Sequence, residues 1–306
     1  MIERIIAIDV GGTNIKYGIV AGGVVQTFSS EPTYPEAGKD QLLEKLKGII
    51  KKYSKVSARV GLGIAGLVDH ERGVVYNPPN FPGWDEVDVK RILESSTDVR
   101  CFVVNDANAY ALGEWQFGSG RGFEDVIAIT LGTGVGGGII TGGRLILGAM
   151  NFAGEIGHMV IDPSGPVCNC GQRGCLEAFL GNGYFSQRAR AYFQRQGQKL
   201  DDYSPHILAE LARNGNKSAA FLWQEYGTFL GIGLVNLIHL FDPDVIVLGG
   251  GISGAFDLFI DSCLQILRSR VMGFERRKLK IEKASLGSNA SLLGAYYFAL
   301  MEGNVS

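Results

Sequence analysis

Hydrophobic positions along the chain fall into two kinds of run. Residues 5–10 (IIAIDV) and 245–248 (VIVL) are short and almost unbroken apolar runs, which are typical of strands buried on both faces. Residues 40–53 instead place apolar side chains such as Leu42 and Leu46 at helical spacing. Because the two kinds of run alternate along the chain, we expect an α/β fold.

The same criteria assign the other elements. We expect strands at residues 5–10, 15–20, 60–64, 100–104, 127–131, 135–141, 245–248 and 279–283. We expect helices at residues 40–53, 87–95, 107–115, 184–196, 205–214, 217–241, 258–270 and 289–301. The helix at 217–241 carries Gly227, Gly231 and Gly233, and glycine permits another segment to pack closely against it.

Two segments far apart in the chain share one pattern. Residues 6–13 read IAIDVGGT, and residues 127–134 read IAITLGTG. Each is an apolar run that ends in a glycine turn, and a second predicted strand follows at once. Two buried strands that end in glycine can resemble each other by chance, but the shared Ile-Ala-Ile core favours an internal duplication.

Composition bounds the class of protein. The chain has 306 residues, 46% of them hydrophobic, which suits two domains with sizeable cores. Its 29 basic and 31 acidic residues form no basic stripe that would indicate nucleic-acid binding. No signal-peptide pattern opens the sequence, and no apolar run is long enough to span a bilayer. We expect a cytoplasmic protein without nucleic-acid or membrane partners.

Three of the five cysteines lie in one short loop, CNCGQRGC, at residues 168–175, and a histidine precedes it. Thiolate and imidazole ligands together suit a tetrahedral zinc ion. Four ligands leave no open position, so the site reads as structural. Ordinary thiols or a disulfide are the alternatives, but clustering beside turn-forming glycines favours a metal in a reducing compartment. The expected ligands are His158, Cys168, Cys170 and Cys175.

Glycine-rich turns follow three of the predicted strands: Gly11-Gly12-Thr13, Gly132-Thr133-Gly134 and Gly249-Gly250-Gly251. Backbone N–H groups without bulky side chains can approach phosphate oxygens closely. Glycine closes many hairpins, so one turn is weak evidence, but three at strand ends favour a nucleotide site. No Gly-Lys-Ser/Thr sequence follows them, which excludes a Walker A loop. The first turn opens a strand rather than a helix, which argues against a Rossmann unit.

Two aspartates at strand ends each have two interpretations. Asp9, beside the first turn, suits the surroundings of Mg²⁺, but it also suits a simple turn. Asp106 follows Asn105 at the end of the strand at 100–104. It suits a general base at the edge of a sheet, but it also suits the cap of the helix that begins at residue 107. The residues by themselves leave both questions open.

Taken together, these motifs resemble the ROK family (repressors, open reading frames and sugar kinases). The matching segments are DVGGTNIK at 9–16, NDANA at 105–109, LGTGVGGG at 131–138, EIGH at 155–158 and CNCGQRGCLE at 168–177. They occur in the family's order and cover nearly the whole chain. The resemblance implies the duplicated actin/hexokinase-like (ribonuclease H-like) α/β fold, with two domains and an interdomain cleft. We expect a small domain of residues 1–115 and 289–306, and a large domain of residues 116–288 that carries the zinc loop.

The resemblance also implies roles for single residues. Asp106 would be the general base that takes the proton of a sugar hydroxyl as it attacks the γ-phosphate of ATP. His158 would hold zinc with one ring nitrogen and face the sugar with the other, so that zinc braces the substrate site. The implied substrate-binding residues are Gly66, Asn80, Asn105, Asp106, Glu155, His158 and Glu177. The implied residues for ATP and Mg²⁺ are Asp9, Gly11, Gly12, Thr13, Asn14, Lys16, Thr133, Gly134, Gly249, Gly250 and Gly251.

The implied activity is ATP-dependent phosphorylation of a hexose. Residues 80–84 (NFPGW) are similar to a segment of the family's glucokinases, so we expect glucose to be converted to glucose 6-phosphate. Mannose, fructose, allose and N-acetylhexosamines are the alternatives, because relatives use nearly the same pocket residues for them.

Other functions of the family or the fold need different residues. Some members are repressors with an N-terminal helix-turn-helix domain, whereas here the phosphate loop begins at Asp9. We therefore expect a kinase rather than a sugar-sensing regulator. An actin-like ATPase would not need Glu155, His158 or Glu177. Members of the family are often dimeric, so we expect a homodimer.

Overall fold

The computed structural model describes residues 3–78 and 81–303. The chain forms two compact units. The first comprises residues 1–124, 138–154 and 285–306, and the second comprises residues 125–137 and 155–284. Residues 116–124, 138–154 and 285–288 therefore group with the first unit, whereas the sequence suggested the second.

The first unit is built on a six-stranded sheet of order β3-β2-β1-β5-β9, with β4 also paired to β2. β1 is antiparallel to β2 and parallel to β5, and β5 is parallel to β9. A separate sheet contains β6, β7 and β8. The strands are β1 (Arg4–Val10), β2 (Asn14–Ala21), β3 (Val24–Val25), β4 (Ser29–Pro32), β5 (Arg59–Ile64), β6 (Leu67–Asp69), β7 (Val74–Tyr76), β8 (Glu86–Asp88) and β9 (Arg100–Asn105).

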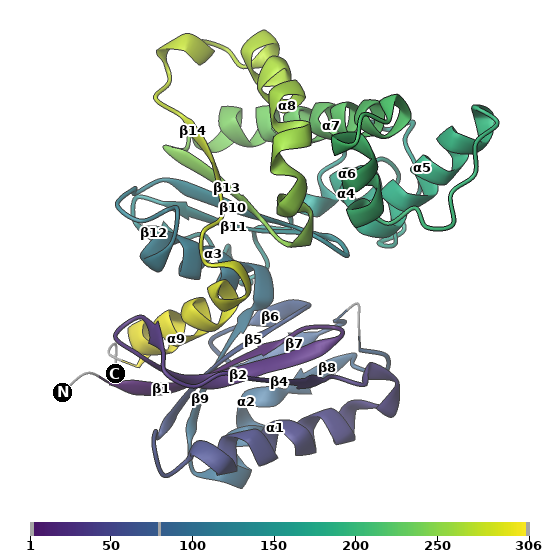
Figure 1. The fold of residues 1–306 in the computed structure, drawn as a ribbon. Helices are drawn as coiled ribbons and strands as arrows, with labels where there is room; N and C mark the ends of the chain where they lie inside the picture. The colour runs from purple at the N-terminus through teal and green to yellow at the C-terminus, as the bar shows by residue number, and fades with distance from the viewer. Residues whose placement is uncertain (1–2, 79–80, 304–306) are drawn as a thin grey trace. The chain divides into compact units, whose positions relative to one another are not determined.

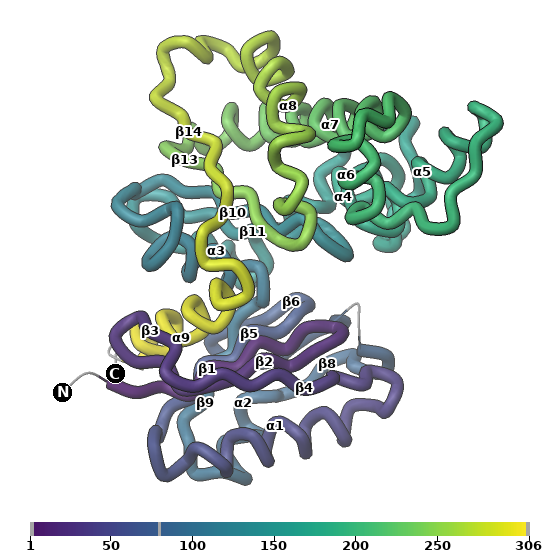
Figure 2. The backbone as a smooth tube through the Cα atoms, in the orientation of Figure 1, coloured from purple at the N-terminus to yellow at the C-terminus, as the bar shows by residue number. Residues whose placement is uncertain are grey.

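Side chains of β1 alternate between two cores, as the pleat of a strand requires. Ile6 and Ile8 belong to the core shared with the helices α1 and α2, and Ile5 and Ala7 belong to the core shared with α3 and α9. Figure 1 and the backbone tube of Figure 2 show α9 and the α1–α2 pair on opposite faces of this sheet. The helices are α1 (Lys39–Tyr53), α2 (Val89–Thr97), α3 (Asp106–Phe117) and α9 (Ala290–Glu302).

Glycines bring α3 and α9 into close contact. A Cβ atom on Gly113 would lie 2.0 Å from the carbonyl oxygen of Ala290, and one on Gly294 would lie 1.6 Å from that of Ala109. Because no side chain fits at either position, the two helix backbones can approach each other directly. This packing holds α3, the helix that begins at Asp106, firmly in the first unit.

The sheet at the centre of the second unit repeats the strand order of the first. It runs β12-β11-β10-β13-β14, with β10 parallel to β13 and β13 parallel to β14. In both sheets a strand that ends in a glycine turn lies between its successor and a parallel strand. The strands are β10 (Val126–Leu131), β11 (Val135–Thr141), β12 (Arg144–Leu145), β13 (Val245–Gly249) and β14 (Lys280–Lys283); β12 and the second half of β11 belong to the first unit.

The long helix α7 has the expected close contacts. A Cβ atom on Gly227 would lie 2.1 Å from the carbonyl oxygen of Phe259 in α8, and one on Gly233 would lie 2.9 Å from the side chain of Leu176 in α4. The predicted reason for these glycines is thus confirmed. The remaining helices are α4 (Leu176–Leu180), α5 (Asn182–Arg195), α6 (Pro205–Arg213), α7 (Lys217–Phe241) and α8 (Phe256–Arg270). Across residues 3–78 and 81–303, no helix is both long enough and apolar enough to span a bilayer.

Candidate functional site

The first glycine turn joins β1 to β2 and is held at its carbonyl groups. The N–H of Gly11 donates to the carbonyl of Asn14 at 3.0 Å. The buried Thr33 donates its hydroxyl to the carbonyl of Gly11 at 2.7 Å and its N–H to the carbonyl of Thr13 at 2.9 Å. Carbonyl oxygens repel phosphate, so fixing them within the unit leaves the outer face of the turn to N–H and hydroxyl donors.

Asp9 and Lys16 face each other across the β1–β2 pair beside this turn. Their charged groups are 3.5 Å apart, and Asp9 is only 7% exposed. Burial raises the pKa of Asp9, while Lys16 and a hydrogen bond with Ser291 lower it. Lys16 is therefore engaged with Asp9 in this structure, and a phosphate would have to compete for its charge.

Asn105, rather than Asp106, caps the helix α3. The Oδ1 atom of Asn105 accepts hydrogen bonds from the N–H groups of Ala107 (2.9 Å) and Asn108 (3.0 Å), as an N-cap residue does. Its Nδ2 donates to the carbonyl of Gly66 at 3.0 Å and carries a second hydrogen. The cap role that the sequence left open for Asp106 thus belongs to its neighbour.

Asp106 occupies the first position of α3 at the end of β9 and is half-buried. Its Oδ1 accepts a hydrogen bond from the N–H of Ala107 at 3.0 Å. A fixed and partly accessible carboxylate at the end of a strand has the properties that a general base needs.

Gly66 is required by the backbone and by its neighbour. Its φ angle of 111° is one that side chains disfavour, and a Cβ atom there would lie 2.9 Å from Pro78. With its carbonyl accepting from Asn105, Gly66 orients the end of β5 against the end of β9. Asn80, the weaker sugar-binding candidate, lies outside the described residues.

The second glycine turn joins β10 to β11 and is supported by a carboxylate. The N–H of Gly132 donates to the carbonyl of Gly134 at 3.0 Å. The N–H of Val135 donates to Oε2 of Glu177 at 2.9 Å, and a Cβ atom on Gly134 would lie 2.2 Å from that oxygen. Glycine is therefore required at position 134 for a reason besides the approach of a phosphate, because a side chain there would clash with Glu177.

The third glycine turn lies directly beside the second. Gly250 follows β13 with φ 79°, and a Cβ atom there would lie 2.3 Å from the carbonyl oxygen of Leu131 at the end of β10. Ser253 donates its hydroxyl to the carbonyl of Gly250 at 2.8 Å. The structure thus brings two of the three predicted phosphate turns together in the second unit, and the first turn belongs to the other unit.

The four predicted metal ligands converge. One ligand atom from each of His158, Cys168, Cys170 and Cys175 lies within 4.8 Å of the others. The sulfur atoms of Cys170 and Cys175 are 3.7 Å apart, and Nδ1 of His158 is 3.7 Å from the sulfur of Cys168. A tetrahedron with Zn–S bonds of about 2.3 Å has S–S edges of about 3.8 Å, so the residues fit zinc. A disulfide, with an S–S bond of about 2.05 Å, is not formed.

Local backbone geometry explains why the loop can close. A Cβ atom on Gly174 (φ 74°) would lie 1.6 Å from the carbonyl oxygen of Asp162, and Gly171 (φ 89°) donates its N–H to the carbonyl of Cys168 at 2.9 Å. The other two cysteines are fully buried, and burial raises the pKa of Cys263 to about 12. These two residues, Cys101 and Cys263, lie outside the metal cluster and behave as core residues.

His158 presents its two ring nitrogens to different groups. Nδ1 faces the thiols, and Nε2 lies 4.0 Å from a carboxylate oxygen of Glu155. Partial burial raises the pKa of Glu155, His158 lowers it, and Glu177 raises it. The free ring edge of His158 and the carboxylates of Glu155 and Glu177 therefore form one polar patch beside the metal ligands.

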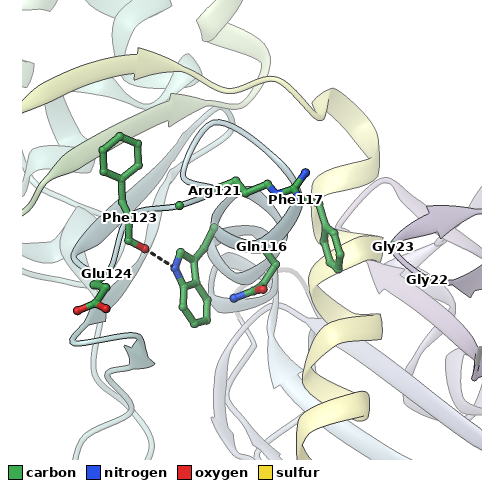
Figure 3. A pocket seen from close by; sticks show the side chains of 9 residues that line it. Gly22, Gly23, Gln116, Phe117, Arg121, Phe123 and Glu124 are labelled. Atoms are coloured by element: carbon green, nitrogen blue, oxygen red, sulfur yellow. Dashed lines mark hydrogen bonds between the residues drawn. The ribbon is translucent and has the colours of Figure 1, made fainter.

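A cavity in the first unit contains none of the predicted residues. It has a volume of about 710 Å³ and includes Arg121, Phe117 and Glu124 in its lining (Figure 3). One wall is fixed by a hydrogen bond of 2.9 Å from the indole nitrogen of Trp115 to the carbonyl of Phe123.

Sequence reasoning missed two residues that hold the site's surroundings. The fully buried Glu114 accepts from the N–H groups of Ser119 (3.0 Å), Ser285 (3.3 Å) and Leu286 (3.0 Å), which lie close to two of the four points where the chain passes from one unit to the other. The hydroxyl of Tyr184 accepts from the N–H of Asn169, inside the metal loop, at 2.8 Å. No local sequence pattern predicts either set of contacts. Ser285 and Leu286 are far from Glu114 in the chain, and Asn169 lies in an irregular loop.

Comparison with known proteins agrees with this geometry. The model of the ROK family matches residues 5–302. The chain is 33% identical to a glucokinase of Thermotoga maritima (95% of this chain, 96% of the relative) and 36% identical to one of Streptomyces coelicolor (95% of each chain). It is also 33% identical to the xylose repressor of Bacillus subtilis, covering 94% of this chain and 75% of the repressor.

Solved structures extend the comparison to the fold. A ROK family glucokinase from Streptomyces griseus, in complex with glucose and AMPPNP, superposes with a TM-score of 0.85 at 32% identity, covering 97% of this chain and 99% of that one. The expected actin/hexokinase-like fold of two α/β domains is thereby confirmed. With a family match over nearly its whole length, the chain belongs to the ROK family.

Proposed function

We propose that this protein is an ATP-dependent hexose kinase whose preferred substrate is glucose, which it converts to glucose 6-phosphate. One observation carries the proposal above all others. Asn105 takes over the capping of α3, so Asp106 is held at the end of β9 without serving as the cap. The glucokinases among the relatives support ATP and glucose as the substrates.

The first unit supplies the proton acceptor and the charge. Asp106 takes the proton of the attacking hydroxyl, and Asn105 fixes the position of that carboxylate through the cap of α3. Asp9 provides a carboxylate beside the first glycine turn, where Mg²⁺ would be held through water and phosphate oxygens. Phosphoryl transfer needs mainly positioning and neutralisation of charge, and these groups serve both needs.

The second unit supplies recognition. In the polar patch, Glu155 and Glu177 would accept hydrogen bonds from sugar hydroxyls, because carboxylates are strong hydrogen-bond acceptors. His158, with Nδ1 facing the thiols, would donate from Nε2 to a sugar oxygen. The turns at Gly132–Gly134 and Gly249–Gly251 lie side by side and offer N–H groups to the nucleotide phosphates. Zinc would be held by His158 and the three thiols and would brace this patch.

A sugar-sensing regulator is the second candidate, and one observation favours it. The xylose repressor of Bacillus subtilis matches this chain as well in identity as the Thermotoga glucokinase does. The chain corresponds to 75% of that repressor, against 96% of the glucokinase. The presence of Asp106 and of the three glycine turns, which sugar binding alone would not need, favours the kinase.

A coupled assay of ADP release across a hexose panel tests the proposal. The purified protein with Mg-ATP should release ADP fastest with glucose, and more slowly with mannose, fructose, allose or N-acetylhexosamines. Faster turnover of another hexose would replace glucose but keep the kinase. Sugar binding without ADP release would indicate the regulator, and ATP hydrolysis independent of sugar would indicate an ATPase.

A further inference from the structure

The metal loop and the second glycine turn are joined by two short connections inside the second unit. The first is the carboxylate of Glu177. Its Oε2 accepts from the N–H of Val135 at the end of the turn (2.9 Å), and its Oε1 lies 3.8 Å from the sulfur of Cys168. One side chain thus contacts a metal ligand and the phosphate-facing turn together.

The second connection runs through the start of α5. The N–H of Asn182 donates to the carbonyl of Gly132 at 2.9 Å. Two residues later, the hydroxyl of Tyr184 accepts from the N–H of Asn169 at 2.8 Å, between the ligands Cys168 and Cys170. The same turn of helix therefore contacts the glycine turn on one side and the metal loop on the other.

The segment between these connections is firmly packed. A Cβ atom on Gly181, between α4 and α5, would lie 3.0 Å from the carbonyl oxygen of Thr133. In α5, Arg188 donates to the carbonyl of Phe179 in α4 at 2.7 Å and pairs with Glu225 of α7 at 2.7 Å. A displacement of the metal loop is therefore transmitted to the turn rather than absorbed between them.

From these contacts we infer that Glu177 and Tyr184 are positioning residues that couple the metal loop to the Gly132–Val135 turn, so that metal occupancy sets the geometry of a nucleotide-binding turn as well as that of the sugar-facing patch. The coupling itself follows from hydrogen bonds within one unit. Its consequence for ATP rests on the proposed function.

Hydrogen–deuterium exchange on the full-length protein tests the coupling without sugar or nucleotide. Removing the metal with a chelator should speed exchange in the peptide that contains residues 131–138. In the zinc-loaded protein, Tyr184→Phe should speed it by about threefold to tenfold, the range that corresponds to losing one hydrogen bond. Tyr192→Phe is the matched control on the same helix, because its ring contact with Phe221 is retained, and it should leave this exchange unchanged.

The exchange rate of the strand β13 serves as the control for the rest of the second unit. If metal removal also speeds exchange at residues 245–248, the second unit has loosened as a whole, and the metal-free protein cannot test the coupling. The exchange rate of residues 131–138 in zinc-loaded Tyr184→Phe then decides whether the coupling exists. Unchanged exchange at 131–138 in that variant, or in the metal-free protein with β13 intact, would overturn the coupling.

Affinity for AMPPNP, measured by calorimetry without sugar, tests the functional consequence. Zinc-loaded Tyr184→Phe should bind AMPPNP about threefold to tenfold more weakly than wild type or Tyr192→Phe. Equal affinity in all three would overturn the link to nucleotide binding. If no form binds AMPPNP while exchange still responds, the coupling stands and the proposed kinase function fails.

Discussion

The two strand–turn–strand segments share a backbone form but are supported in different ways. The turn at Gly11–Thr13 is fixed by Thr33, a residue of its own sheet region, and lies beside the buried pair of Asp9 and Lys16. The turn at Gly132–Gly134 has no aspartate at the position of Asp9, because Thr130 stands there. It is fixed instead by Glu177, which lies two residues beyond a metal ligand.

This difference indicates that the two copies of the turn in the duplicated fold have different roles. In the first unit the turn lies beside the charged pair of Asp9 and Lys16, and the proposed proton acceptor, Asp106, follows β9, which β5 separates from β1 in the sheet. In the second unit the turn is held by Glu177, which also belongs to the polar patch proposed to bind the sugar. Loss of a carboxylate in the first unit should therefore affect chemistry, whereas loss of the metal in the second should affect binding and stability.

The largest effect is expected at Asp106. Asp106→Asn should lower kcat by about 10²- to 10⁴-fold, because the attacking hydroxyl loses its proton acceptor. Glucose affinity, measured by calorimetry, should change little. Asp98→Asn, at an exposed carboxylate of the same unit, is the control and should keep full activity. Normal turnover in Asp106→Asn would remove it as the base.

The second largest effect is expected when a metal ligand is removed. Cys170 is the exposed ligand, so Cys170→Ser removes a thiolate without opening the core. We expect loss of stoichiometric zinc and a melting temperature lower by about 5–10 °C, since metal binding contributes to folding and a unit of this size loses roughly 2–4 °C per kcal/mol. Mass spectrometry of metal content and thermal melts measure both.

Cys263→Ala serves as the control for that substitution, because it removes a buried thiol outside the metal loop and should leave the zinc content unchanged. If Cys170→Ser retains a full complement of zinc with unchanged activity, the bracing role is contradicted.

Glu114 offers a carboxylate in the first unit that resembles Glu177 without a metal. Glu114→Gln replaces an acceptor of three backbone N–H groups by an amide, and we expect a loss of about 1–3 kcal/mol in the free energy of unfolding. Denaturant unfolding measures it. The exposed Glu36→Gln should stay within about 0.5 kcal/mol of wild type. An equally small loss of unfolding free energy in Glu114→Gln and Glu36→Gln would mean that the buried carboxylate does not stabilise the fold.

The smallest predicted effect concerns the pH dependence of stability at Asp9. Burial raises its pKa, so the fold favours the protonated carboxyl, and the charged form costs stability. That cost is absent below the ordinary value of 3.8 and grows as the pH rises through the raised pKa. Asp9→Asn should therefore melt above wild type at pH 8, and the difference should shrink as the pH falls towards 4.

Asp98→Asn is again the control for the melts, and its difference from wild type should not vary in this way. A gap between Asp9→Asn and wild type that widens towards acidic pH would contradict the sign of the shift.

Elements with strong local signals were predictable. The helix α7 occupies the predicted residues 217–241, because Asn216 caps its start through its side chain and Asp242 ends it in a left-handed conformation. The buried strands were equally clear. The small sheet of β6, β7 and β8 was not predicted, because strands of three residues are too short to show a period.

The residues of the site also divide into those that the sequence could predict and those that it could not. The metal ligands were evident because three cysteines and a histidine lie within 18 residues of sequence, from His158 to Cys175, and the structure brings them together. Asn105 and Asp106 are nearly equal as N-caps, so only the folded backbone could assign the cap. The bond between Glu177 and Val135 spans 42 positions, and no local pattern reports such a contact.

Product analysis tests the central claim most directly. Phosphorus NMR of the protein with Mg-ATP and glucose follows both products at once. The kinase proposed above should form glucose 6-phosphate and ADP in equal amounts, and Asp106→Asn should form neither at a comparable rate. ATP that persists while calorimetry shows glucose bound, or ADP that appears without a sugar phosphate, would contradict the account.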